Sequence, residues 1–194
     1  MFLQKPSGHD YPQLTEQGAG RRLFFKAGLS ACAMLTLPTA YAAYPKTPVK
    51  QLTLLNLHTG ERIKSVYWEK GRYIPGALKD IEKVLRDHRT GKTHAIDLQL
   101  LDMMQLLHRQ MGAHKEFQVI SGYRSPETNK MLAKQNNSVA KQSLHMQGRA
   151  IDIRLPEFSL SDLRKAALSL KVGGVGYYPN SNFIHLDTGH VRHW

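Results

Sequence analysis

Residues 149–154 read Arg-Ala-Ile-Asp-Ile-Arg, an alternation of aliphatic and polar residues. This pattern is typical of a β-strand with one buried face, because successive side chains point to opposite sides of a sheet. Ile151 and Ile153 are therefore expected in the core, and Asp152 is expected on the other face. An aspartate flanked by isoleucines makes this strand the first place to look for a functional site.

Residues 182–187 read Asn-Phe-Ile-His-Leu-Asp and repeat the alternation. Ile184 and Leu186 share one face of the expected strand. His185 and Asp187 share the other, roughly 7 Å apart along the strand. If the two strands pair, an aspartate and a histidine lie side by side on the exposed face of the sheet.

A second histidine comes from the loop that precedes the first strand. His145 lies a few residues before Asp152, and Gly148 permits a turn that brings the imidazole over the carboxylate. Two imidazoles and one carboxylate, with a fourth position open, form a ligand set used by hydrolytic zinc sites. The spacing alone also allows ordinary alternatives, namely a surface aspartate on a one-sided sheet and histidines that bind no metal.

The rest of the chain predicts an α+β fold. Helices are expected where apolar residues recur at helical spacing, over residues 77–87, 97–111, from 126 onward and 159–170. Strands are expected over residues 51–57, 61–68, 116–120, 149–154, 174–178 and 182–187. Because a hairpin comes first and most strands follow the helices, we expect an antiparallel sheet that carries the zinc site, with helices packed on one side.

Residues 1–42 are predicted to be a cleaved export signal. Arg21-Arg22, followed by aromatic residues and a lysine, resembles a twin-arginine motif, and Ala40-Tyr41-Ala42 has the small-x-small pattern of a cleavage site. The apolar run between them is much shorter than the ~20 residues of a membrane-spanning helix. We therefore expect a mature domain of residues 43–194 in the periplasm, without an integral membrane segment.

The composition narrows the class of partner. The chain has 27 Lys and Arg against 15 Asp and Glu, a net charge of +12, which excludes an acidic solvating protein. Nucleic acid, a membrane surface and an anionic cell-wall polymer remain as possible partners, and export favours the wall polymer over nucleic acid.

The single cysteine, Cys32, excludes an intramolecular disulfide and a multi-cysteine zinc site. Residues 29–32 also resemble a lipoprotein cleavage box, and that alternative stays open.

Two motifs resemble one superfamily of zinc peptidases, the D-Ala-D-Ala carboxypeptidases and endopeptidases, which also includes lysostaphin-type and hedgehog-type folds. The motifs are Ser121-Gly122-Tyr123-Arg124-Ser125 and Ser143-x-His145-x-x-Gly148-x-Ala150-x-Asp152, the latter followed by His185-x-Asp187. The resemblance runs from about residue 116 to the end of the sequence. It implies Zn²⁺ as the cofactor and the peptide cross-links of peptidoglycan as the substrate.

The resemblance also implies roles for single residues. It makes His145, Asp152 and His185 the zinc ligands. It makes Arg124 the residue that binds the substrate or stabilises the oxyanion, which suits a guanidinium facing carboxylate-bearing wall peptides.

The catalytic base is where this sequence departs from the superfamily. Some relatives carry a glutamate three residues before the last ligand, where this chain has Asn182, which cannot act as a base. Asp187 is a candidate for the base, or equally for a residue that orients an imidazole. His190 and His193 are weaker candidates.

Two rival functions stay open. The first is a D-alanyl carboxypeptidase that trims a terminal residue. The second is a non-catalytic peptidoglycan-binding module, suggested by Asn182. The sequence predicts neither the bond that is cut, D,D or L,D, nor the oligomeric state.

Overall fold

A computed structural model describes residues 48–135 and 139–194. The predicted export signal and its cleavage site therefore lie outside the described residues. The helices are α1 (Pro75–Val84), α2 (Leu98–Gln110), α3 (Pro126–Gln135) and α4 (Leu160–Leu170). The strands are β1 (Val49–Asn56), β2 (Arg62–Glu69), β3 (Arg72–Tyr73), β4 (Phe117–Ser121), β5 (Ala150–Arg154), β6 (Gly174–Tyr178), β7 (Phe183–Asp187) and β8 (Arg192–His193).

The α+β class is confirmed, but the expectation of an antiparallel sheet is wrong. The described strands form one sheet in the order β3-β2-β1-β4-β5-β7-β6-β8. Most pairs are antiparallel, whereas β1 pairs with β4, and β6 with β8, in parallel. The first parallel pair arises because α1 and α2 separate β1 from β4, and a connection of that length can return the chain to run in the same direction.

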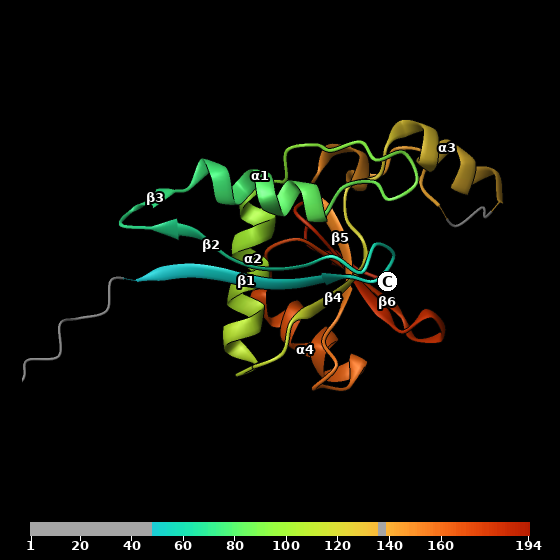
Figure 1. The fold of residues 1–194 in the computed structure, drawn as a ribbon. Coiled ribbons are helices and arrows are strands. Elements are labelled where there is room, and N and C mark those ends of the chain that lie inside the picture. Colours follow the sequence, from blue (N-terminus) through green and yellow to red (C-terminus); the bar gives the residue numbers. More distant parts are fainter. Residues whose placement is uncertain (1–47, 136–138) are drawn as a thin grey trace, which may run out of the picture. The chain divides into compact units, whose positions relative to one another are not determined.

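One face of this sheet is covered by helices. Leu54 pairs with Phe117, Val119 pairs with Ile153, and Ile153 pairs with Ile184 across neighbouring strands, and all of these side chains are fully buried. Residues of α1, α2 and α4 complete the same hydrophobic core, whereas α3 contributes none of the core residues in the described part of the chain. Figure 1 shows α1 lying alongside the long β1–β2 hairpin and α3 set apart from it. Three of the four helices thus match the expectation of helices on one side.

The helix starts follow the sequence signals. Asp97 accepts a hydrogen bond from the backbone of Gln99 at the start of α2, and Ser159 does the same for Asp162 at the start of α4. Asp97 also accepts a hydrogen bond from Thr188, which directly follows β7. The capping residue of α2 therefore joins the helical layer to the strand that carries His185.

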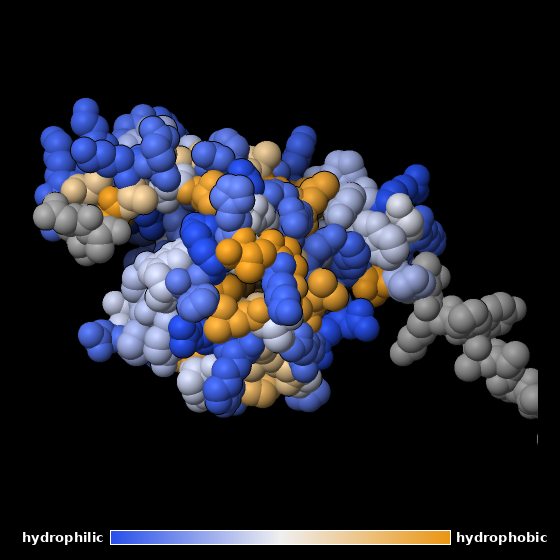
Figure 2. All heavy atoms as spheres, turned by 180° about the vertical axis from the view of Figure 1, so that it is seen from behind, coloured by the Kyte–Doolittle hydropathy of each residue, from blue (hydrophilic) through white to orange (hydrophobic). Residues whose placement is uncertain are grey.

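The rear face of the molecule carries an apolar area with hydrophilic side chains around it (Figure 2). Figure 2 shows hydrophobic side chains gathered near the middle of the rear face, with hydrophilic side chains around them. Among the helices that the structure describes, none combines the length and the apolar character needed to cross a bilayer.

Candidate metal centre and its cleft

The pairing of β5 with β7 brings the first two predicted ligands together. Asp152 lies directly opposite His185 in the antiparallel register. The residues on either side of Asp152 in β5, Ile151 and Ile153, point into the core and are fully buried. The alternation predicted from the sequence therefore places the carboxylate and the imidazole on the sheet face that the hydrophobic core does not occupy.

His145 reaches the same place from the short 3₁₀ turn Leu144–Gln147. The turn ends at Gly148, whose φ of 65° is in the left-handed region, and a Cβ there would clash with the carbonyl oxygen of Ala95. Nδ1 of His145 lies 2.8 Å from the carbonyl oxygen of Gly122. Because a carbonyl can only accept, Nδ1 donates this hydrogen bond, and Nε2 is left to face Asp152 and His185.

The three candidate ligand atoms form a small triangle. Nδ1 of His185 lies 2.9 Å from Oδ1 of Asp152 and 3.2 Å from Nε2 of His145, and the third side, from Nε2 to Oδ1, is 3.4 Å. Tetrahedral zinc with bonds of about 2.0–2.2 Å requires ligand atoms roughly 3.3–3.6 Å apart. The donor set and its spacing therefore fit zinc after shifts of a few tenths of an ångström.

Asp187 contacts the imidazole of His185 at the ring nitrogen that faces away from Asp152. Oδ2 of Asp187 lies 3.0 Å from Nε2 of His185, so this nitrogen donates and Nδ1 is left to face Asp152. The Asp187 side chain is 0% exposed. It also accepts hydrogen bonds from the backbone of Gly174 and Gly189 and a bidentate pair from Arg192, at 2.7 and 3.1 Å. Burial alone would raise the pKa of Asp187, but these donors outweigh it and keep that pKa well below its usual range.

The two carboxylates also change the acidity of His185. Burial lowers its pKa, but the hydrogen bonds to Asp152 and Asp187 outweigh burial and raise the pKa of His185 from 6.5 to about 9. The same contacts, with His145, hold the pKa of Asp152 below its usual range despite the cost of burying it. Without a bound cation, a proton on His185 thus balances part of the negative charge of the site.

Arg124 is a second cationic side chain of the cleft, beside Arg192. Toward the residues that the structure describes, its side chain donates two long hydrogen bonds, 3.4 Å each, to Ser121 and Asn129, and its guanidinium lies 3.7 Å from Asp152. Burial lowers the pKa of Arg124 while Asp152 acts in the opposite direction. Since a guanidinium has five N–H donors, most of its capacity remains for a bound molecule.

These side chains line a cleft of about 540 Å³. Arg192, Trp194 and Tyr178 line it as well, and the sequence analysis did not assign the first two to the site. Arg192 and His193 form a strand of two residues, too short to carry a periodic signal. His190 and His193 are exposed, and neither they nor Asn182 are among the lining residues.

Comparison with known proteins identifies the family. A family model described as peptidoglycan L,D-endopeptidase MepK matches residues 44–194. The chain belongs to the MepK family. The MepK of Escherichia coli K12 is 45% identical over 91% of this chain and 97% of its own length. A probable peptidoglycan L,D-endopeptidase MepK of Haemophilus influenzae is 39% identical over 90% of this chain and 95% of its own length.

Membership of the MepK family confirms the resemblance drawn from the two sequence motifs. The family match spans residues 44–194, and so includes every residue that the structure describes, whereas the sequence motifs begin only at about residue 116. The charge excess and the cleft therefore belong to a peptidase domain, and the nucleic-acid alternative has no support from the comparisons.

The acidity of His185 gives a testable prediction for the metal-free protein. A histidine whose pKa is raised by folding stabilises the protein fully below the unfolded pKa of about 6.5. That contribution is lost as the pH rises through the folded pKa of about 9. The unfolding free energy of the wild type, relative to His185→Gln, should therefore decrease between pH 6.5 and 9. Urea titrations of both proteins with a chelator measure it, and a constant difference over this range would contradict the assignment.

Proposed function

We propose that this chain is a zinc-dependent endopeptidase that hydrolyses peptide cross-links of peptidoglycan, with His145, Asp152 and His185 as the metal ligands. The observation that carries the proposal is the triangle of three ligand atoms, with sides of 2.9, 3.2 and 3.4 Å, on the floor of a cleft. The relatives are named L,D-endopeptidases. We therefore assign to this chain the L,D bond, which the sequence alone left open.

The metal would supply a nucleophile and a Lewis acid, since bound zinc lowers the pKa of a water ligand to about 7 and polarises a carbonyl. The residues of the chain prepare the site for it. The carbonyl of Gly122 accepts a hydrogen bond from His145 at 2.8 Å, and the carboxylate of Asp187 accepts one from His185 at 3.0 Å. Both rings can therefore present a lone pair to the cleft once His185 has lost its extra proton. Asp152 contributes the negative charge.

Arg124 binds the peptide in this proposal. The side chain lines the cleft with unused N–H donors and lies close to Asp152. A guanidinium in this position holds the carbonyl oxygen of the scissile amide or a stem-peptide carboxylate, and it stabilises the oxyanion that develops in the transition state.

Asp187 acts as an orienting residue rather than as the general base. A base must reach the proton that it removes, but the Asp187 side chain is 0% exposed and both of its oxygens accept hydrogen bonds. Its contact with Nε2 of His185 is the contact that fixes a ligand ring. Among the described residues, Asp152 and Asp187 are the only acidic residues that line the cleft.

We also propose that residues 1–42 direct export by the twin-arginine route and are removed, which leaves residues 43–194 in the periplasm. The support is the order of charged, apolar and small residues in this segment, together with relatives whose names specify peptidoglycan. The wall polymer lies outside the cytoplasm, so an enzyme that acts on it has to be exported.

The proposed function predicts a defined set of products. Purified protein with zinc should convert cross-linked muropeptide dimers of isolated sacculi into monomers, whereas His185→Ala should not. Mass spectrometry of the soluble products identifies the bond. Release of free D-alanine with intact dimers would indicate a carboxypeptidase instead, and no product despite one bound zinc per chain would indicate a binding module.

The orienting role of Asp187 predicts how a substitution should behave. Asp187→Asn should weaken zinc binding by about 10–100-fold, because the ligand ring loses its charged partner. Saturating zinc should then restore a large part of the turnover. A competition titration against a chelator, combined with turnover at rising zinc, measures both effects. Asp162→Asn, at the start of α4, is the matched control. Unchanged zinc affinity with turnover that zinc cannot restore would identify Asp187 as the base.

The role of Arg124 predicts a loss without an effect on the metal. Arg124→Ala should lower kcat/KM on a muropeptide dimer by about 100-fold or more, since one donor to a developing oxyanion contributes on this order. Zinc affinity should stay within about twofold of the wild type. The exposed Arg89, replaced by alanine, controls for the loss of one positive charge. Near-normal kcat/KM in Arg124→Ala would remove this residue from the proposed site.

A further inference from the structure

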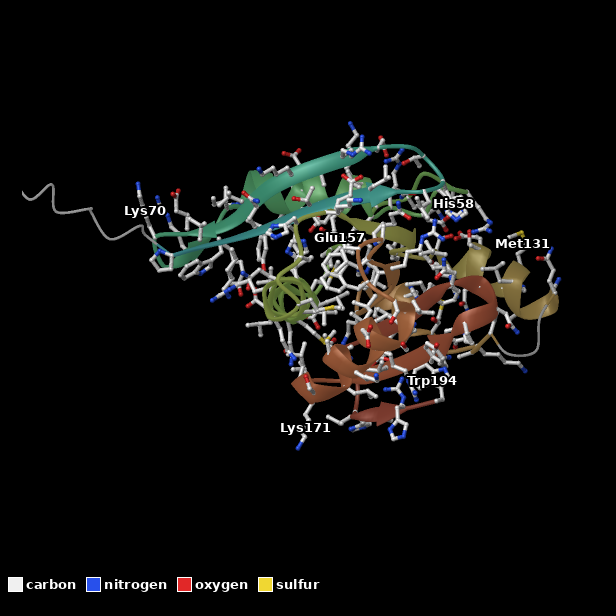
Figure 3. All side chains as sticks on the ribbon, turned by 90° about the horizontal axis from the view of Figure 1, so that it is seen from below. His58, Lys70, Met131, Glu157, Lys171 and Trp194 are labelled. Carbon is white, nitrogen blue, oxygen red and sulfur yellow. The ribbon has the colours of Figure 1, made fainter. Side chains whose placement is uncertain are left out.

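One polar contact at the rim of the cleft has no part in the function proposed above. The indole N–H of Trp194 donates a hydrogen bond of 2.8 Å to the hydroxyl oxygen of Tyr178. Both side chains line the cleft. Figure 3 shows Trp194 beside the red strands at the end of the chain. Tyr178 is partly exposed rather than buried, so its contact with Trp194 is not required to offset a cost of burial.

Trp194 is held in place by backbone and packing contacts. Its carbonyl oxygen accepts from the amide of Tyr177 at 3.0 Å, and its own amide donates to Val175 at 3.3 Å. The indole lies over Gly176, where a Cβ would come within 2.8 Å of the ring. Gly176 pairs with His185 across the sheet, and the two rings, indole and imidazole, are 5.3 Å apart. Because Gly176 has no side chain, the indole of Trp194 can lie close to the candidate metal centre.

The ring of Tyr178 is also fixed. It stacks on Phe183 with 4.7 Å between the ring centroids and an angle of 19° between the planes. The hydroxyl oxygen accepts from an indole N–H, which can only donate, so the hydroxyl proton is not used in this contact. Among the described residues, none accepts a hydrogen bond from this hydroxyl, so the O–H of a fixed ring at the wall of the cleft can donate to a bound molecule.

We propose that Tyr178 is a substrate-binding residue, and that Trp194 is the residue that positions its hydroxyl. The acceptor is a carbonyl or carboxylate oxygen of the bound peptide, the kind of group that a stem peptide carries in abundance. This inference rests on the proposed function for the identity of the peptide. Arg124, from the loop between β4 and α3, and Tyr178, at the end of β6, then hold the peptide from two different elements of the fold.

The test is a double-mutant cycle between Tyr178 and Trp194. Tyr178→Phe should raise the KM for a purified muropeptide dimer about tenfold with little change in kcat, because the lost hydrogen bond is present in the bound substrate and in the transition state alike. Trp194→Phe should give a smaller rise, and it should add nothing to the effect of Tyr178→Phe. Two independent effects that multiply would mean that Trp194 only packs against the site, and this would overturn its positioning role.

Calorimetry of a muropeptide monomer binding to the metal-free protein provides a readout that does not depend on turnover. The dissociation constant should be about tenfold higher for Tyr178→Phe than for the wild type. Tyr177→Phe is the matched control, because Tyr177 lies on the same strand but belongs to the opposite, core-facing side, where it packs under Arg164. Zinc affinity and thermal unfolding of each variant show whether the metal site and the fold are intact.

The outcomes separate this inference from the proposed function. If the wild type cleaves dimers and Tyr178→Phe binds and cleaves as well as the wild type, the role of Tyr178 is overturned and the endopeptidase function stands. If the wild type cleaves nothing but Tyr178→Phe weakens monomer binding tenfold, the endopeptidase function falls and the role of Tyr178 stands. Equal losses in Tyr177→Phe and Tyr178→Phe, or a loss of zinc affinity in Tyr178→Phe, would reduce Tyr178 to a structural residue.

Discussion

The register between β5 and β7 is the constraint on which the candidate site depends. A shift of one residue would turn Asp152 into the core and an isoleucine into the cleft, because side chains alternate along a strand. The register is held by aliphatic pairs on the other face, where Ile151 meets Leu186 and Ile153 meets Ile184. Hydrophobic packing on one side of the sheet thus sets the distance between the candidate ligands Asp152 and His185 on the other side.

A second layer of contacts decides which atoms face the cleft. Each imidazole has two nitrogens, and the hydrogen bond made by one of them determines what the other can do. For His145 the partner is a backbone carbonyl, and for His185 it is a buried carboxylate. A buried, isolated carboxylate would be costly, and Asp187 avoids that cost through Arg192 and two backbone amides. The last few residues of the chain are therefore part of the site.

The sequence predicted the parts of this arrangement that depend on local pattern. Alternation was enough to assign the faces of Asp152 and His185, and Gly148 was enough to expect the turn that carries His145. The sheet order was not accessible, because the pairing of β1 with β4 joins strands about sixty residues apart and leaves no local trace. Trp194 was missed for a related reason. Trp194 follows β8, a strand of only two residues, and its indole packs over Gly176, a contact that the sequence does not show.

The balance of donors and acceptors in the cleft indicates the kind of molecule that fits there. Among the described residues, both carboxylates of the lining are committed, Asp152 to the imidazoles and Asp187 to His185 and Arg192. The guanidinium of Arg124 and the hydroxyl of Tyr178 have unused donor capacity toward the cleft. A cleft of this polarity complements a ligand rich in carbonyl and carboxylate oxygens and repels one that is cationic. The net charge of +10 of residues 43–194, with 23 Lys and Arg against 13 Asp and Glu, acts in the same direction at longer range, since it attracts an anionic polymer before any contact is made.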